Sequence, residues 1–268
     1  MVEIERFLVD KLVKHFLVLK FRRAEAGQSM EEGQLGTASC FVIHVGSWFL
    51  VTAAHVIEDL KRAVAQGVRF DNWALHDEGA GHKFLFGVPI AFDPSEWWFA
   101  ADHDAGLDYA AWPLPNLTIR ALEAGGVVPL SEAAWRNTPA EAFSAHLLVG
   151  IPGESVSPTV TGVQGRIVMM PLAICPPPLG YEHRADNMFF ARIKANDSPS
   201  VQSVDDIGGM SGGPIFGVRT VDGVGKYSAI GIQSGWWQSL RVVSCCRLEG
   251  FATALRDWVS EHGISSNS

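Results

Sequence analysis

Residues 208–216 read GGMSGGPIF, a stretch that places Ser211 among four glycines. Glycine has no Cβ atom, so it weakens the packing of a helix or a strand and loses more conformational entropy on folding than other residues. Four glycines in six positions therefore favour a tight turn, in which another backbone can approach the Ser211 hydroxyl closely. On this segment alone, a flexible surface loop is the alternative interpretation.

The composition indicates a globular chain. Of its 268 residues, 47% are hydrophobic and 19% are charged, enough for one large domain or two small ones with proper cores. The formal net charge is −8 and no long basic run occurs, so we expect neither nucleic acid nor a membrane as a partner. Charged residues also interrupt the first 21 residues, which argues against a signal peptide. We therefore expect a cytoplasmic protein.

The cysteines and histidines indicate neither a disulfide framework nor a metal site. A disulfide between adjacent cysteines would be strained, no CxxC pair occurs, and the nine histidines are scattered. We expect reduced thiols, no metal and no organic cofactor. The four cysteines are Cys40, Cys175, Cys245 and Cys246.

Most of the chain has the pattern of short strands. Helical spacing occurs only near the ends, at residues 3–13 and 250–259, and a period of two begins at His15. Many short strands and few helices favour an all-β sandwich or barrel. Residues 116–140 gather glycine, proline and acidic residues, which suggests a link between two β halves. The further strand-like segments are 38–45, 48–52, 83–90, 107–114, 146–150, 159–169, 188–193, 214–218 and 227–234.

Ser211 needs a base to become a nucleophile, and the chain supplies one upstream. Residues 49–57 read FLVTAAHVI, an apolar strand that leads to His55, and Asp108 opens the alternating strand GLDYAAWPL. Asp102 and Asp104 compete with Asp108, but only Asp108 begins such a strand. The string G-M-S-G-G also fits the nucleophile elbow of α/β-hydrolase esterases, whose acid and histidine follow the serine. Here they precede it, so this alternative is weaker.

The segments VTAAHV, DYAAWPL and GMSGGPIF, with GIQSG at 231–235, together resemble the trypsin/chymotrypsin-like serine proteases over residues 35–260. The resemblance implies two perpendicular six-stranded β-barrels with short N-terminal and C-terminal helices, and an active site between the barrels. The expected divisions are an N-terminal helix or arm (1–14), a first barrel (15–115), the link (116–140), a second barrel (141–248), and a helix and tail (249–268).

The same resemblance assigns roles to individual residues. His55 would be the general base, Asp108 its orienting partner and Ser211 the nucleophile. The N–H groups of Gly209 and Ser211 would form the oxyanion hole. The implied activity is that of a serine endopeptidase that cleaves protein or peptide substrates through an acyl-enzyme. The alternative is a catalytically silent binding or scaffold protein on the same fold.

Two departures set the chain apart from secreted relatives and make it more similar to Deg-type members. Cys40 lacks its disulfide partner, because Val56 follows the histidine. Met210 precedes Ser211 where pancreatic-type enzymes carry an acid that pairs with a newly cut N-terminus. Activation by removal of a propeptide is therefore not expected, and a regulatory protein partner is a further hypothesis.

Two segments supply candidate residues for the substrate pocket. Asp205 lies six residues before Ser211, where trypsin-like enzymes carry the acid that selects Arg or Lys. The adjacent Asp206 leaves open which of the two residues would occupy that position. A solvated acidic loop is the commoner explanation of two adjacent aspartates. The strand around Ser234 and Gly235 would line the substrate backbone and the primary pocket. Trp236 would form a wall of that pocket or narrow it, which would favour a smaller side chain.

Overall fold

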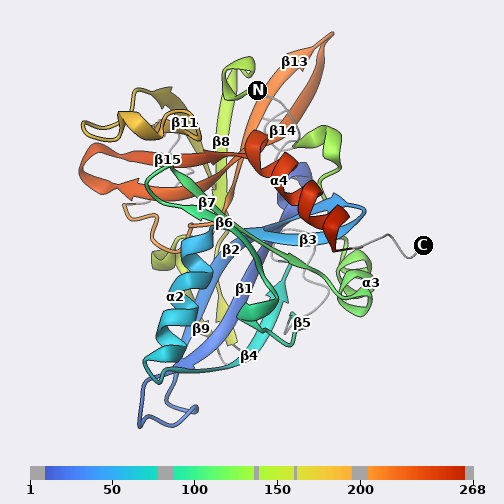
Figure 1. Ribbon diagram of the computed structural model, residues 1–268. Helices are drawn as coiled ribbons and strands as arrows, with labels where there is room; N and C mark the ends of the chain where they lie inside the picture. The colour runs from blue at the N-terminus through green and yellow to red at the C-terminus, as the bar shows by residue number, and fades with distance from the viewer. Residues whose placement is uncertain (1–9, 78–86, 136–138, 160–161, 195–204, 263–268) are drawn as a thin grey trace.

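The molecule consists of two β structures. The computed structural model describes the chain except for residues 1–9, 78–86, 136–138, 160–161, 195–204 and 263–268. A closed barrel occupies the upper part of Figure 1 and a seven-stranded sheet the lower part, with α2 and α4 packed along them. The predicted all-β class with two β halves is therefore confirmed.

The first half is an antiparallel sheet with the strand order β5-β4-β1-β2-β3-β7-β6. It differs from the expected six-stranded barrel, because it has seven strands and no ladder among the described residues joins β5 to β6. The expected strand at 83–90 is described only as the short β5, since residues 83–86 lie outside the described part. The strands are β1 Phe16–Ala24, β2 Gln34–Val45, β3 Ser47–Thr52, β4 Arg69–His76, β5 Val88–Pro89, β6 Trp98–Asp102 and β7 Leu107–Pro113.

The second half is a closed barrel with the strand order β11-β12-β15-β14-β13-β8. The sequence predicted one strand over 159–169, but the structure divides this region between a separate two-stranded ribbon, β9 and β10, and the start of β11. The strands are β8 Ala145–Gly150, β9 Ser157–Thr159, β10 Gly162–Gln164, β11 Val168–Cys175, β12 Met188–Ile193, β13 Pro214–Val221, β14 Val224–Trp237 and β15 Val242–Arg247.

Three complete α-helices accompany the sheets in the described part of the chain. The C-terminal helix α4 (Leu248–Glu261) agrees with the prediction, whereas α2 (Ala54–Ala65) and α3 (Asn116–Gly125) were not expected, and α3 lies within the predicted link. Of the helix predicted at residues 3–13, residues 10–12 are helical and Val13 begins the 3₁₀ helix η1, whereas residues 3–9 lie outside the described part. The one-turn 3₁₀ helices are η1 Val13–His15, η2 Pro94–Glu96, η3 Glu132–Ala134, η4 Ala140–Ala142, η5 Gly153–Ser155, η6 Glu182–Arg184 and η7 Gln238–Leu240.

A single apolar cluster joins the two halves. It contains Phe41 and Tyr109 from the sheet, Phe216 from the barrel and Phe251 from α4, all almost completely buried. The Phe251 ring lies 5.2 Å from that of Tyr109 and 5.9 Å from that of Trp135. Because this core spans both halves, it fixes the position of side chains that reach the interface from either half.

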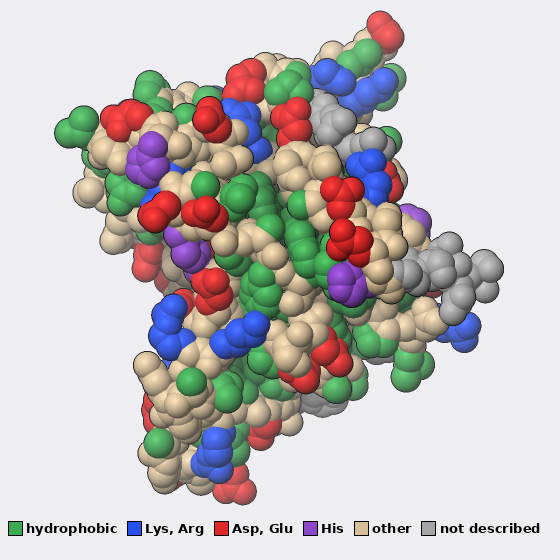
Figure 2. All heavy atoms as spheres, viewed as in Figure 1, with side chains coloured by type: hydrophobic (Ala, Val, Ile, Leu, Met, Phe, Trp, Pro, Cys, Tyr) green, Lys and Arg blue, Asp and Glu red, His purple; other side chains and the backbone are tan. Residues whose placement is uncertain are grey.

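The visible surface carries charges of both signs, and the thiols are free. On the face drawn in Figure 2, basic and acidic side chains are interspersed and form no single basic patch. All four cysteines are free, and burial raises the pKa of Cys40 to about 12. None of the helices in the described part of the chain is long and apolar enough to cross a membrane.

Candidate active site

The pairing of two strands brings Asp108 to His55. In the antiparallel pair β3–β7, Thr52 lies opposite Ala110, so Asp108 lies just beyond the end of β3. The chain leaves β3 at Thr52 and begins α2 at Ala54, which places His55 in the first turn of the helix. The strand ladder therefore holds Asp108, and the N-terminus of α2 holds His55.

Asp108 accepts three hydrogen bonds. Its Oδ1 lies 2.8 Å from the backbone nitrogen of His55, and its Oδ2 lies 2.7 Å from His55 Nδ1. The hydroxyl of Ser234 also donates to Oδ2. The side chain of Asp108 is only 3% exposed, and these donors, together with the positive end of α2, offset the cost of burying its charge.

Burial and charge oppose each other at this pair. Burial of the imidazole lowers the pKa of His55, but the hydrogen bond and charge of Asp108, aided by Asp59 and Glu58, outweigh it, so the pKa is raised. Burial by itself raises the pKa of Asp108, but its bonds to His55 and Ser234 and the charge of the imidazolium lower it. Asp108 therefore stays ionised at neutral pH and stabilises a protonated His55.

Ser211 lies in a turn that the glycines make possible. Gly209 and Gly212 have φ values of +88° and +85°, in the left-handed region. A Cβ atom on Gly212 would overlap the Thr52 hydroxyl and would lie 2.5 Å from the Ser39 carbonyl oxygen. The buried side chain of Met210 packs in the barrel core beside Gly150, so this residue anchors the turn. The segment is thus a fixed turn, as its glycine content predicted, rather than a loose loop.

The turn leaves two backbone donors unused. The N–H of Met210 donates to Ile207 and that of Gly212 donates to Gln233, at 3.0 and 2.9 Å. The N–H groups of Gly209 and Ser211 have no acceptor within the part of the chain that the structure describes. These are the two donors that the sequence analysis assigned to an oxyanion hole.

Ser39, which the sequence analysis did not single out, ties the turn to the first half. Its hydroxyl, on β2, donates to the carbonyl oxygen of Gly209 at 3.1 Å and accepts from the backbone of Ile151 at 3.4 Å. The Thr52 hydroxyl donates to the Ser39 carbonyl at 2.9 Å. Nothing in the local sequence could have indicated this residue, because its partners lie more than 100 positions away, apart from Thr52.

His55, Gly209 and Ser211 line one groove of about 260 Å³ between the two halves, which we call the serine groove. The His55 side chain is 28% exposed, so its imidazole remains accessible from solvent. No hydrogen bond joins Ser211 to His55 among the described residues. Hydrogen bonds between a nucleophile and its base are often long before substrate binds, so the arrangement is compatible with a catalytic pair.

The other predicted residues have different surroundings. Asp102, the last residue of β6, and Asp104, in the turn that follows it, are exposed and take no part in the contacts between Asp108 and His55. Ser234, expected in the substrate pocket, instead bonds to Asp108.

The remaining pocket residues do not line the serine groove. Asp205 is exposed, and its backbone N–H donates to Glu154 at 3.2 Å. Gly235 accepts a bond from the Gln233 side chain at 3.1 Å, and Trp236 packs against the barrel core. The structure therefore gathers His55, Asp108, Ser211 and Gly209, and the composition of the primary pocket stays a prediction. Within the described residues, no group of three His, Cys, Asp or Glu side chains forms a metal-binding cluster.

Comparison with known proteins identifies the fold. No family model matches the sequence, and no curated protein is similar to it. A thermostable serine protease from an extremophilic microorganism matches with a TM-score of 0.50 and 15% identity, over 94% of this chain and 99% of that chain. An inactivated protease paralogue of the scabies mite matches with the same TM-score and identity, over 94% and 96% of the two chains. The chain therefore has the fold of the chymotrypsin-like serine proteases.

Proposed function

We propose that this protein is a serine endopeptidase that hydrolyses peptide bonds in protein or peptide substrates. The observation that carries the proposal is the shared groove: His55 and Ser211 line it together, while the buried Asp108 holds the opposite nitrogen of the imidazole. The unused N–H groups of Gly209 and Ser211 in the same turn give further support.

The proposed reaction begins with attack of Ser211 Oγ on the substrate carbonyl carbon. His55 Nε2 takes the hydroxyl proton, and Asp108 stabilises the imidazolium through its bond to Nδ1. The carbonyl oxygen becomes an oxyanion and accepts bonds from the two unused N–H groups. His55 then gives the proton to the leaving amine, the C–N bond breaks, and water hydrolyses the acyl-enzyme by the same steps in reverse.

Two alternatives are weaker. An α/β-hydrolase esterase would need a doubly wound parallel sheet, whereas the described residues form a closed antiparallel barrel and an antiparallel sheet. A silent scaffold has the same fold, as the inactivated mite paralogue illustrates. The present chain retains the serine, histidine and aspartate, as well as the two unused N–H donors, so the observations favour an enzyme.

The proposal is tested by release of fluorescent peptides from labelled casein. Ser211→Ala should reduce kcat on the order of 10⁶-fold, because the nucleophile and its base act as a unit. The exposed Ser260, whose hydroxyl donates to Arg256 in α4, supplies the matched control: Ser260→Ala should leave turnover unchanged. Turnover that persists in Ser211→Ala at more than a few per cent would overturn the assignment.

We also propose a cytoplasmic location and a regulatory protein partner. The four free thiols support a reducing compartment. Met210 is buried in the barrel core and cannot pair with a new N-terminus, so control by a partner is more plausible than control by propeptide removal.

A further inference from the structure

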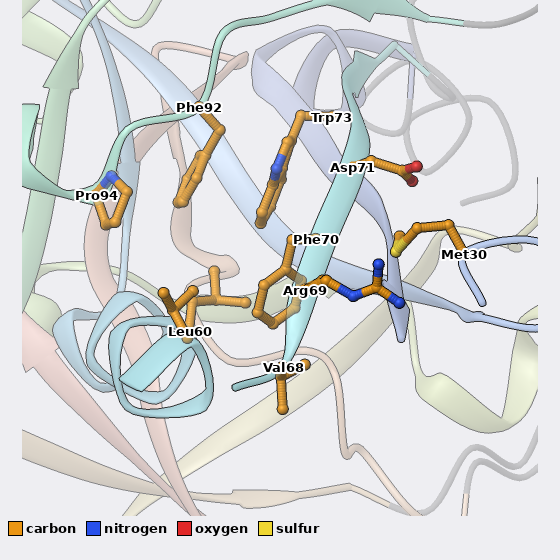
Figure 3. Close-up of a pocket in the computed structure, with 10 residues that line it drawn as sticks. Met30, Leu60, Val68, Arg69, Phe70, Asp71, Trp73, Phe92 and Pro94 are labelled. Carbon is orange, nitrogen blue, oxygen red and sulfur yellow. The ribbon is translucent and has the colours of Figure 1, made fainter. Parts of the chain in front are cut away.

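A second groove, of about 470 Å³, lies beside α2 and β4, where partly buried aromatic side chains pack against the core of the first half. We call it the aromatic groove, because the rings of three residues form its wall (Figure 3). The Trp73 and Phe92 rings stack with their centroids 4.0 Å apart and an interplanar angle of 14°. Apart from Arg69 and Asp71, the side chains that line it are apolar: Met30, Leu60, Val64, Val68, Phe70, Trp73, Phe92 and Pro94.

The aromatic groove continues the serine groove. Leu60 and Phe70 line both grooves. Phe21 lines the serine groove, and its ring lies 5.5 Å from that of Phe70 and 4.7 Å from that of Trp73. A continuous row of aromatic rings therefore leads from the neighbourhood of Ser211 to the aromatic groove.

The groove is apolar and open to solvent. Val64 is 53% exposed, and Phe70, Trp73 and Phe92 are each only partly buried. Its volume and its apolar lining are typical of sites that take a large side chain rather than of a flat surface. Apolar area left open in this way favours an apolar occupant, because covering it removes that area from water.

The position of the groove indicates which part of a substrate would reach it. The resemblance assigns the strand around Ser234 and Gly235 to the substrate backbone and the primary pocket. Neither residue lines the serine groove, which extends instead past Thr37 and Ala38 of β2 toward α2. The two connected grooves therefore lie away from that strand, beside α2, and would be reached by substrate residues at some distance from the cleaved bond.

We propose that the aromatic groove is a specificity site that binds a large apolar side chain of the polypeptide substrate, a few residues away from the cleaved bond. The inference rests on the proposed peptidase function, since the same extended chain must pass Ser211. This specificity site gives the protein a preference for unfolded or extended segments that carry Phe, Leu, Met or Trp a few residues away from the cleaved bond.

Cleavage-site mapping on a peptide library made from a denatured proteome tests this inference. The wild-type protein should show about fivefold or greater enrichment of Phe, Leu, Met and Trp at one position a few residues away from the cleaved bond. Val64→Lys places a charge in the groove and should abolish that enrichment, while preferences next to the cleaved bond stay unchanged. Val224→Lys is the matched control, because Val224 is 59% exposed at the β13–β14 hairpin, outside both grooves.

The outcomes separate the two proposals. Cleavage without a distal apolar preference, or a preference that survives in Val64→Lys, would overturn the specificity site and leave the peptidase intact. No cleavage by any variant would overturn the peptidase and the site that depends on it. A wild-type dimer that becomes a monomer in Val64→Lys, measured by light scattering, would show that a second copy occupies the groove and would also overturn the inference.

Discussion

The carboxylate of Asp108 organises the candidate site because its two oxygens are used differently. Oδ1 accepts the backbone N–H of His55, which fixes the start of α2, and Oδ2 accepts the imidazole and the Ser234 hydroxyl. One side chain thus positions the helix and orients the ring. Its replacement should therefore affect both the ionisation of His55 and the rate of the reaction.

Asp108→Asn should lower the pKa of His55 and the activity together. The pKa of His55 is raised above 6.5, and only neutral His55 can act as a base, so wild-type kcat/KM should fall as the pH drops through that raised pKa. Without the charge of Asp108, the effect of burial on the imidazole remains, so the pH midpoint of the His55 titration moves downward. We expect kcat to decrease about 10⁴-fold, as in a related triad. NMR titration of His55 measures the midpoint.

Asp59→Asn is the control for this experiment. Asp59 contributes less than Asp108 to the raised pKa of His55, and it already pairs with Arg62 at 2.7 Å. Its replacement should shift the midpoint slightly in the same direction. A midpoint that does not move in Asp108→Asn would contradict the proposed electrostatic role.

At the scale of elements, the turn at 208–213 depends on glycine most strongly at Gly212. Its φ of +85° is unfavourable for other residues, and a Cβ atom would meet Thr52 and the backbone of Ser39 and Ala53. Gly212→Ala should therefore lower the free energy of unfolding by more than the roughly 1–2 kcal/mol of left-handed strain alone. Thermal or urea unfolding measures the difference.

Gly223→Ala isolates the backbone strain from the collision. Gly223 has a similar φ of +76°, and no atom lies within 4 Å of the position that its Cβ would occupy. Gly223→Ala should therefore lower the free energy of unfolding by only roughly 1–2 kcal/mol. Equal destabilisation by the two substitutions would indicate that close contact at Gly212 is not what requires glycine there.

The elements could be predicted from the sequence only in part. Strands with alternating or continuous apolar residues, such as β3 and β7, agree with the prediction. Helix α2 was missed although Ala54, Ile57 and Leu60 have helical spacing and are its buried residues, because the preceding apolar strand dominated the pattern. Strands β4 and β6 have mixed burial and lack clear alternation, so periodicity alone could not identify them.

At the scale of the whole molecule, the candidate site is assembled from distant parts of the chain. Asp108 comes from the sheet, His55 from the helix α2 that follows β3, and Ser211 from the turn before β13 of the barrel. The apolar cluster that spans both halves keeps these three segments together. The three segments and their order could be read from the sequence. The Ser39 bridge, the unused N–H groups and the aromatic groove could not, because each depends on contacts between segments that are remote in sequence.

Labelling with a fluorophosphonate probe tests directly whether Ser211 is an activated nucleophile. Ser211 Oγ should attack phosphorus and displace fluoride while His55 accepts the hydroxyl proton, which leaves one stable adduct per chain. Mass spectrometry should locate the adduct on the peptide that contains Ser211. The adduct should be absent from Ser211→Ala and from heat-denatured protein, and greatly reduced in His55→Ala. No adduct on the folded wild-type chain, or an adduct on another residue, would contradict the assignment of Ser211 as an activated nucleophile.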